Sequence, residues 1–475
     1  MSDAKSIVKN VASLYIGEIL SQVLNFFLII TIARYLGDTG LGKYSFAYSF
    51  VALFLILADM GLPTLITKEV AKDKSLTKLH LTKTFTLKLL LNIATFIITI
   101  AAIVISRRDN ETILLVALAA IAMFFYNLAG IYRAIFQAYE SMKYEAYSRI
   151  VERIIASVTA IFLLYKGYGI ISLFLVLISS NLVYYFVLYI LAKMKISDVS
   201  FVIDTVSWKK SLKEAMPFWI TVIFISIYFR IDTIMLGFMK GFAPTGWYNA
   251  ASKIIEVIMR IPFLLIVAIF PTLAKFHKMS YDKTRLLYEK AFYYMILIVL
   301  PITTGLIMLA DRIIKYVYSQ AFTNSILALQ ILAASLIFAF VNYLMGYLLN
   351  AIDKQKFFTL TAVITTIFNV FLNLVLIPMY SYIGAGIATL ISEIVSFCLL
   401  YYFTSKNKFP LALAKIAVKP LIANLIVIGL IIYLKKLNLF LIISLCALAY
   451  FAVLYIIKGV SKDEIRIVQS FVYKK

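Results

Sequence analysis

The chain has 475 residues, of which 63% are hydrophobic and 15% are charged. A soluble globular domain is about 45–50% apolar and about 25% charged, so this composition excludes a soluble protein and a disordered one. The 46 Lys and Arg residues outnumber the 23 Asp and Glu residues, which gives a net charge of +23. In a membrane protein such an excess is expected from the positive-inside rule, so it is not an indication of nucleic-acid binding.

Continuous apolar runs of about 20 residues recur along the whole chain and predict an all-α polytopic membrane protein, because a barrel would show short alternating segments. We predict fourteen transmembrane helices, at residues 11–33, 44–67, 84–105, 113–132, 150–165, 169–192, 214–238, 250–272, 291–310, 325–350, 357–378, 383–403, 416–434 and 439–457. Of the 46 cations, 32 lie in or beside the connections on the side of both termini and 10 on the opposite side. This bias predicts a multi-pass protein of the cell membrane with both termini in the cytoplasm.

The first six predicted spans resemble the next six, which indicates an internal repeat. Thr39-Gly40 precedes span 2 as Thr245-Gly246 precedes span 8, and Leu62-Pro63-Thr64-Leu65 corresponds to Phe270-Pro271-Thr272-Leu273. An even number of spans in each repeat makes the two repeats parallel, as in some secondary transporters. We therefore predict a six-helix lobe at 1–193, a second at 194–405, and two further helices with a tail at 406–475.

Two stretches resemble the motifs of Wzx-type polysaccharide flippases. One is Arg34-Tyr35-Leu36-Gly37-Asp38-Thr39-Gly40-Leu41-Gly42-Lys43-Tyr44 followed by Leu57-Ala58-Asp59-Met60-Gly61-Leu62, and the other is Arg230-Ile231-Asp232-Thr233-Ile234-Met235-Leu236-Gly237. This resemblance places the chain in the multidrug/oligosaccharidyl-lipid/polysaccharide (MOP) exporter superfamily and implies a MATE-like fold.

The family resemblance implies a flippase rather than an enzyme. Its expected substrate is an oligosaccharide linked to polyprenyl pyrophosphate, moved from the inner to the outer leaflet by alternating access. Coupling to H⁺ or Na⁺ is part of this hypothesis. The expected partners are this glycolipid, membrane lipid and glycan-assembly proteins, with no nucleic acid, cofactor or metal.

A charge within the bilayer costs several kcal/mol, so charged residues in the spans indicate functional positions. Lys253, Glu256 and Arg260 are spaced to share one helical face of span 8, and span 7 adds Arg230 and Asp232. Three cations against two acids favour a cationic cavity that receives pyrophosphate and acidic sugars. The alternative is an ion-pair network that holds spans 7 and 8 together.

Further polar residues in the spans have two interpretations. Glu18, Gln22 and Asn25 form a polar stripe on span 1, and Glu393 lies near the middle of span 12. Together with Asp232 and Glu256, the carboxylates Glu18 and Glu393 are candidate ion-coupling or cavity groups. Asn369 and Asn373 give span 11 a polar face that suits sugar hydroxyls. Interhelical hydrogen bonding is the alternative for each of these residues.

Three residues are candidates for structural or gating roles. Asp59 belongs to the family-like motif, and we expect it to pair with a cation such as Lys68 or Arg133. Pro63 follows it, and Pro262 is expected to bend span 8.

Other basic residues are expected at the membrane surface. Lys88, near the end of span 3, is expected to extend its ammonium group to the interface. Arg133, Arg149 and Arg153 are counted with the connection between spans 4 and 5.

Two other functions remain open from the sequence. A multidrug or cation antiporter of the same superfamily is one, although fourteen spans and the excess of intramembrane base argue against it. A polytopic glycosyltransferase or polymerase is the other, with Asp109-Asn110-Glu111 as the carboxylate pair that would hold a divalent metal.

Overall fold

The computed structural model describes residues 2–196 and 202–459. Within these residues the chain is helical throughout, and eleven helices are long and apolar enough to cross a membrane. The α-helices are α1 (Ser2–Asp59), α2 (Leu62–Lys72), α3 (Thr77–Ile105), α4 (Asn110–Ala138), α5 (Met142–Tyr165), α6 (Ile170–Lys195), α7 (Thr205–Met239), α8 (Phe242–Ile258), α9 (Arg260–Met279), α10 (Tyr281–Met308), α11 (Ala310–Val317), α12 (Ser325–Ala351), α13 (Gln355–Lys406), α14 (Leu413–Tyr433) and α15 (Leu439–Ile456). Short 3₁₀ turns at Lys74–Leu76 and Gln320–Phe322 complete the elements.

Two of the long helices are interrupted at a single residue. Helix α1 contains Gly37 with φ 69° and ψ −169°, and α13 contains Ser381 with φ 54° and ψ −135°. The left-handed φ of Gly37 carries no steric penalty because glycine has no Cβ, whereas Ser381 accepts strain there. Each of these helices therefore covers two of the spans predicted from the sequence.

The second predicted span, residues 44–67, is wrong at its end. The helix stops at Asp59, since Met60 and Gly61 both have positive φ values of 43° and 71°. Pro63 lies at the start of the separate helix α2, a position where its missing N–H costs nothing. The family-like motif at Asp59 therefore forms an elbow between two helices.

The chain folds into two compact units. The first consists of Met1–Ala250 and Asn373–Tyr382, and the second of Ala251–Leu372 and Ile383–Lys475. The predicted lobes at 1–193 and 194–405 stay a prediction, because compactness and sequence repetition are different properties.

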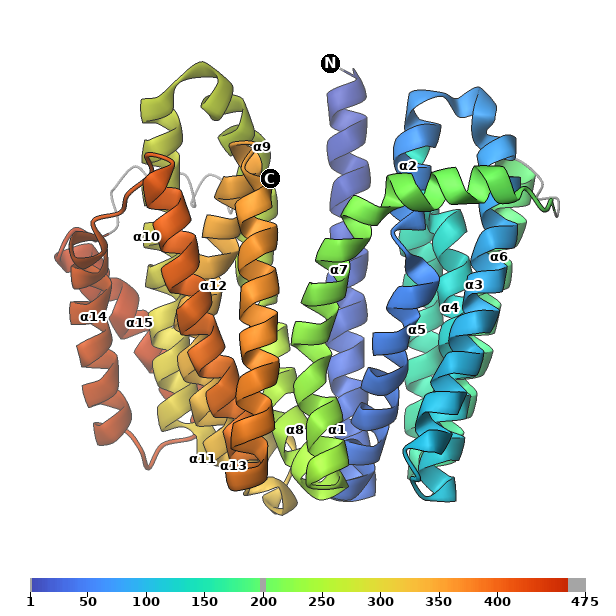
Figure 1. The fold of residues 1–475 in the computed structure, drawn as a ribbon. Helices are drawn as coiled ribbons and strands as arrows, with labels where there is room; N and C mark the ends of the chain where they lie inside the picture. Colours follow the sequence, from blue (N-terminus) through green and yellow to red (C-terminus); the bar gives the residue numbers. More distant parts are fainter. Residues whose placement is uncertain (1, 197–201, 460–475) are drawn as a thin grey trace. The chain divides into compact units, whose positions relative to one another are not determined.

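In the first unit α4 packs against α6, and α1 packs against α5. Figure 1 shows α3, α4, α5 and α6 running side by side. Their core contains the fully buried aromatic residues Tyr132 and Phe136 on α4, with Leu188 from α6. Within a bilayer such side chains stabilise the bundle through van der Waals packing and aromatic contacts, because lipid is as apolar as they are.

The amino-terminal part of α7 bends across α2 in Figure 1 and is held there by polar and apolar contacts. Lys83 on α3 forms an ion pair of 2.7 Å with Asp204, and the indole N–H of Trp208 donates to the Lys83 carbonyl over 3.0 Å. Trp208 and Leu212 also pack on the cluster around Leu62 and Leu87. We call residues 204–215 the strap.

The second unit has its own apolar core where α14 and α15 pack against α10. It contains Leu297, Val427, Ile442 and Tyr450, and the Tyr450 hydroxyl donates to the Leu297 carbonyl over 2.7 Å. The two carboxy-terminal helices are therefore an integral part of this unit.

Candidate functional site

A buried carboxylate lies in the first unit where α7, α8 and the segment Asn373–Tyr382 meet. Asp232 is 7% exposed. The Tyr248 hydroxyl donates to its Oδ2 over 2.5 Å, and the Asn373 side-chain amide donates to its Oδ1 over 2.6 Å. Each carboxylate oxygen thus accepts a hydrogen bond from an uncharged donor.

A second polar pair lies one residue further along both helices. Asn249 donates to the Thr233 hydroxyl over 3.2 Å and to the Thr245 carbonyl over 2.9 Å. Because Thr233 and Asn249 are both buried, these bonds fix the register of α7 on α8. They leave the position of the Asp232 carboxylate well defined.

This arrangement gives Asp232 a specific chemical capacity. A carboxylate within a membrane span is costly unless it is paired, protonated or bound to a cation. Two neutral donors stabilise its charged form without supplying a counter-charge. This setting makes Asp232 a carboxylate to consider for ion coupling.

The three cations predicted to form a cavity have different surroundings. Arg230 is half-buried, and its guanidinium lies 5.3 Å from the centroid of the Tyr48 ring. Among the described residues of its unit, no carboxylate oxygen lies within 4.0 Å of it. Arg260 in the second unit is likewise half-buried, and no described residue of that unit forms an ion pair with it.

Lys253 is different, because both oxygens of Glu256 accept a hydrogen bond of 2.8 Å from its ammonium group. Both residues lie on α8, so this pair is local to one helix and is not the ion-pair network between spans 7 and 8 that was the alternative interpretation. Arg230 belongs to the first unit and Lys253 and Arg260 to the second, so the cavity of all three cations stays a prediction.

Span 8 is broken at Met259, which lies between α8 and α9. The sequence predicts a bend at Pro262, three residues later, in the first turn of α9. The break also means that helical spacing alone no longer places Arg260 on the face of Lys253 and Glu256.

Asp59 pairs with Lys88 and not with the expected Lys68 or Arg133. The Lys88 ammonium lies 3.1 Å from Asp59 Oδ1, and the exposed fractions of the Lys88 and Asp59 side chains are 0% and 36%. The expectation that Lys88 extends to the interface is therefore wrong. Its carboxylate partner keeps it inside the bundle, at the elbow between α1 and α2.

A group of charged residues within α4 and α5 escapes the sequence prediction. Arg133 lies within α4, and Arg149 and Arg153 lie within α5 rather than in a connection. Glu145 and Glu152 are buried beside them, at 3.6 Å from Arg149 and 3.9 Å from Arg153. The helical spacing of the charges was the available signal, but a stretch so rich in charge resembles a loop in its hydropathy.

Glu393 is held by an amide from the neighbouring helix of the second unit. Asn342 on α12 donates to Glu393 Oε2 over 2.7 Å and to the Glu393 carbonyl over 3.0 Å. Its carboxyl group is thus a hydrogen-bonded core group, as one of the two interpretations expected.

The remaining predicted polar residues of spans 1 and 11 differ in burial. The side chain of Glu18 lies outside the described residues, whereas Gln22 and Asn25 are half-buried. Asn369 is 1% exposed, which places it in the protein interior.

The Asp109-Asn110-Glu111 triplet has structural roles. Asp109 caps α4 by accepting a 3.0 Å hydrogen bond from the Thr112 amide, and Glu111 pairs with Lys43. These contacts use both carboxylates that a metal-dependent transferase would need.

The two Thr-Gly motifs of the predicted repeat meet within the first unit, where α1 and α8 approach closely. The Trp247 indole N–H donates to Asp38 Oδ2 over 2.7 Å. A Cβ on Gly42 would collide with the Phe242 carbonyl, and one on Gly246 would collide with the Asp38 carbonyl. The motifs thus contact each other through reciprocal glycines, which allow the backbones to approach.

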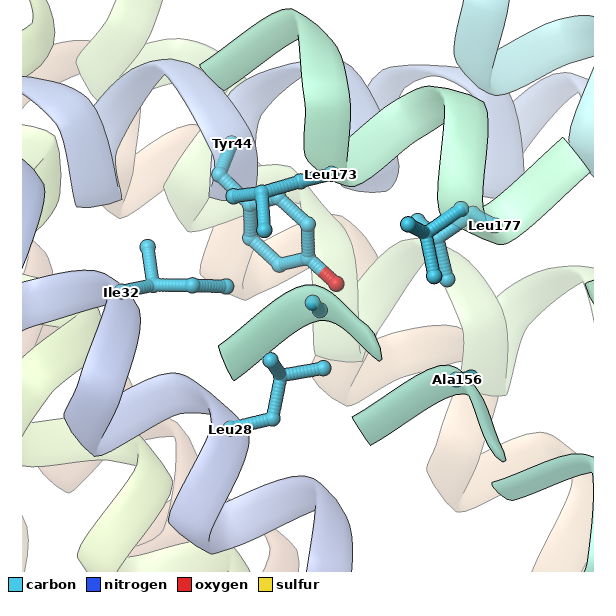
Figure 2. A pocket seen from close by; sticks show the side chains of 8 residues that line it. Leu28, Ile32, Tyr44, Ala156, Leu173 and Leu177 are labelled. Atoms are coloured by element: carbon cyan, nitrogen blue, oxygen red, sulfur yellow. The ribbon is translucent and has the colours of Figure 1, made fainter. Parts of the chain in front are cut away.

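A narrow hollow between α1, α5 and α6 is not a sugar site. Figure 2 shows its lining of Leu28, Ile32, Tyr44, Ala156, Leu173 and Leu177, to which Ala160 and Val176 also contribute. The lining is apolar apart from the Tyr44 hydroxyl, and the hollow is too narrow for a water molecule.

Several known proteins are similar to this chain in sequence. A family model described as "Polysaccharide biosynthesis protein" matches residues 7–277. An uncharacterized membrane protein of Methanocaldococcus jannaschii is 25% identical over 47% of this chain and 45% of its own length. The lipid II flippase MurJ of Bacillus subtilis is 25% identical over 82% of this chain and 80% of its own. The probable low-salt glycan biosynthesis flippase Agl15 of Haloferax volcanii is 25% identical over 38% of each chain. The matched region thus spans less than half the length of the two archaeal relatives.

Solved structures share the fold. A structure of the lipid II flippase MurJ in an inward closed conformation matches with a TM-score of 0.76 and 19% identity, over 94% of this chain and 98% of its own. An inward-facing multidrug resistance MATE transporter of the MOP superfamily matches with a TM-score of 0.63 and 15% identity, over 84% and 99%. The chain therefore has a MurJ- and MATE-like helical fold, and the MATE-like fold is the one that the family resemblance implied.

Proposed function

The chain belongs to the polysaccharide biosynthesis protein family, and from this premise we propose that it is a flippase for lipid-linked oligosaccharides. It is a multi-pass membrane protein of a transporter family and not an enzyme. The proposed cargo is an oligosaccharide on polyprenyl pyrophosphate, moved from the inner to the outer leaflet by alternating access. The names of the similar flippases from Bacillus and Haloferax support this cargo class.

One observation carries the proposal: Arg230 and Arg260 lack an ion-pair partner among the described residues of their own units. A cation held in a membrane span without a counter-ion is costly, so its retention favours an anionic guest. A guanidinium group remains charged when desolvated and binds phosphate oxygens through two parallel N–H bonds. The ring of Tyr48 attracts the Arg230 guanidinium and limits its rotation without neutralising its charge.

The test is export of glycan in a cell that depends on this chain. We expect Arg230→Ala and Arg260→Ala each to abolish surface glycan while the protein still reaches the membrane. Arg285→Ala is the matched control, because Arg285 forms an exposed 2.8 Å pair with Glu289 on the same helix. Full export by both test variants would overturn the role of these arginines.

We propose that coupling to H⁺ or Na⁺ takes place at Asp232. Its burial and its two neutral donors, Tyr248 and Asn373, support this role. Glu393 is a second candidate carboxylate, with Asn342 as its donor. Glu18 and Glu256 keep their predicted status as cavity carboxylates.

The proposed topology has fourteen spans with both termini in the cytoplasm. The eleven candidate helices support this number, because α1 and α13 each cover two spans and α5 adds one. Helix α5 is less apolar than the others because it carries charges at Glu145, Arg149, Glu152 and Arg153. Two parallel six-helix repeats followed by two helices would then form the transporter.

A multidrug or cation antiporter is the second candidate function. The observation that favours it is the buried Asp232 carboxylate, since an acidic group attracts organic cations. Resistance to organic cations on expression, without any change in surface glycan, would select this function over the first.

A further inference from the structure

Lys88 and Arg133 lie side by side inside the first unit, on α3 and α4. A Cβ on Gly130 would lie 3.5 Å from Lys88 Nζ and 3.3 Å from Arg133 Nη2. Two atoms that close to one point are at most about 7 Å apart. Both cationic groups thus border the space beside the Gly130 Cα.

The charge of this pair is only half compensated by its carboxylate neighbour. Asp59 Oδ1 lies 3.1 Å from Lys88 Nζ, and the Asp59 side chain is 36% exposed whereas that of Lys88 is 0% exposed. The next charged groups are Glu145 and Arg149 on α5, which pair with each other at 3.6 Å. Two positive charges therefore share one negative charge that also faces solvent.

Hydrogen-bond donors remain on both cations. An ammonium group has three N–H donors and a guanidinium has five. Among the described residues, the Lys88 ammonium has one acceptor, Asp59, and Arg133 donates to the Tyr126 hydroxyl over 3.0 Å. Arg133 Nε is buried and has no hydrogen-bond partner in this part of the chain.

Neighbouring groups hold the pair in place. The Arg133 guanidinium lies 4.6 Å from the centroid of the Tyr126 ring. Asn92 donates to the Lys88 carbonyl over 2.8 Å, and Asn127 donates to Asn92 over 3.0 Å. The site is therefore preorganised by the half-buried Tyr126 and by the buried, hydrogen-bonded pair Asn92 and Asn127.

We propose that Lys88 and Arg133, whose charged groups both lie beside Gly130, form a binding site for the diphosphate group of an isoprenoid lipid. This inference rests on the proposed function and adds a site in the first unit to the arginines considered there. Two adjacent cations match the paired negative charges of a diphosphate better than the charge of one phosphate. Asp59 acts as the internal anion that the diphosphate displaces from Lys88.

The experiment measures binding of farnesyl diphosphate and farnesyl monophosphate to the purified full-length protein by isothermal titration. We expect wild type to prefer the diphosphate, and Lys88→Gln and Arg133→Gln each to weaken its binding at least tenfold. The matched control, Arg285→Gln, removes a surface cation and should leave the affinity unchanged. Unchanged affinity in Arg133→Gln would overturn the proposal, as would equal binding of both phosphates.

Asp59→Asn gives the readout that a purely structural role would not produce. Removing the competing carboxylate should tighten diphosphate binding severalfold relative to wild type, whereas the control Arg285→Gln should bind as wild type does. If the cluster only stabilises the fold, Asp59→Asn leaves Lys88 buried and unpaired, so binding would stay the same or weaken. That result would overturn the proposal even if Lys88→Gln failed to fold.

Gly130→Ala separates crowding from loss of charge. The added methyl group would lie in van der Waals contact with both cationic groups and fill space that a bound diphosphate needs, without changing any charge, while alanine favours the helix over glycine. We expect a folded protein with at least fivefold weaker diphosphate binding. A folded variant with wild-type affinity would contradict the placement of the site.

Flipping of a lipid-linked oligosaccharide in proteoliposomes separates this inference from the proposed function. If wild type flips nothing but binds diphosphate through Arg133, the site stands and the proposed function fails. If Arg133→Gln flips as fast as wild type, the site fails and the proposed function stands.

Discussion

The Tyr248 hydroxyl donates to Asp232 Oδ2 over 2.5 Å and so joins α8 to a buried carboxylate on α7. Asn373, 141 residues further along the chain than Asp232, donates to the other oxygen. A carboxylate held by donors from two other segments has a defined position. This property is what an ion-coupling residue needs.

Asp232→Asn tests that role. The amide oxygen can still accept from Tyr248, but the new NH2 group faces the Asn373 donor unless the Asn373 amide turns over, so we expect a folded variant with a lower melting temperature. Transport should lose its dependence on a pH or Na⁺ gradient, because the side chain no longer titrates. Flipping rates in proteoliposomes with and without each gradient measure this, and a gradient response equal to that of wild type would rule the residue out.

Tyr248→Phe removes one donor and keeps the ring. Hydrogen bonds to charged groups contribute about 1.5–3 kcal/mol, so we expect the free energy of unfolding to fall by that amount. The control is Tyr35→Phe, because Tyr35 is 51% exposed. Thermal unfolding in detergent compares the two, and an equal effect of both changes would contradict the importance of the Tyr248 bond.

The reciprocal glycine contact between α1 and α8 predicts an effect at Gly246. Its added Cβ would collide with the Asp38 carbonyl, a backbone atom that cannot rotate away. We expect Gly246→Ala to cost about 1–3 kcal/mol, as overpacking does elsewhere, and to weaken the contact of Trp247 with Asp38. Gly305 in helix α10 has no heavy atom within 4 Å of such a Cβ, so Gly305→Ala is the control. Equal stability of the two variants would be inconsistent with the close approach.

The contact between the strap and α3 is predicted to weaken at acidic pH. Hydrogen bonds from the Lys83 side chain and the Ser207 amide lower the pKa of Asp204 below its ordinary value of 3.8. The stabilisation from this carboxylate is therefore complete above pH 3.8 and is lost as the pH falls through the lower pKa of the folded state. We expect Trp208 fluorescence to change over that range in wild type and not in Asp204→Asn. A transition of the same amplitude in both proteins would assign it to another group.

The pair of Asn342 and Glu393 allows the two interpretations of Glu393 to be compared. Glu393→Gln keeps an oxygen that accepts from Asn342, so we expect stability within about 1 kcal/mol of wild type. Unchanged transport would show that Glu393 has only a structural role, as a hydrogen-bonded residue of the core. Loss of the gradient response at unchanged stability would instead add Glu393 to the coupling groups.

The helices could be predicted from the sequence because a helix that crosses the hydrocarbon core of a bilayer needs about 20 consecutive apolar residues. The bends are harder to place. Pro262 predicts one bend. The interruption at Ser381 depends on a strained backbone conformation, and serine does not favour that conformation, so the sequence does not predict it. Charged residues near a helix end also shorten the apolar run, which is why the fifth span is predicted to begin only at residue 150 and Arg149 falls in a connection, whereas the structure places it in α5.

The hydrogen-bond and ion-pair partners of the candidate site residues could not be predicted from the sequence. Asp232 is identifiable as a candidate because a charge in a span is rare, but its donor Asn373 lies on a distant helix. Asp59 is expected to pair with a cation, and only the structure identifies Lys88 as that cation. Spacing relates residues on one helix, whereas pairing between helices depends on how the chain packs.

The chain contains three tryptophans. The indole N–H groups donate to the Lys83 carbonyl from Trp208, to the Ile56 carbonyl from Trp219, and to Asp38 Oδ2 from Trp247. All three acceptors belong to the first unit, as do the tryptophans themselves. Tryptophan fluorescence is consequently a built-in spectroscopic reporter of that unit alone, and single Trp→Phe variants would resolve the strap, the middle of α7 and the α1–α8 contact without any added label.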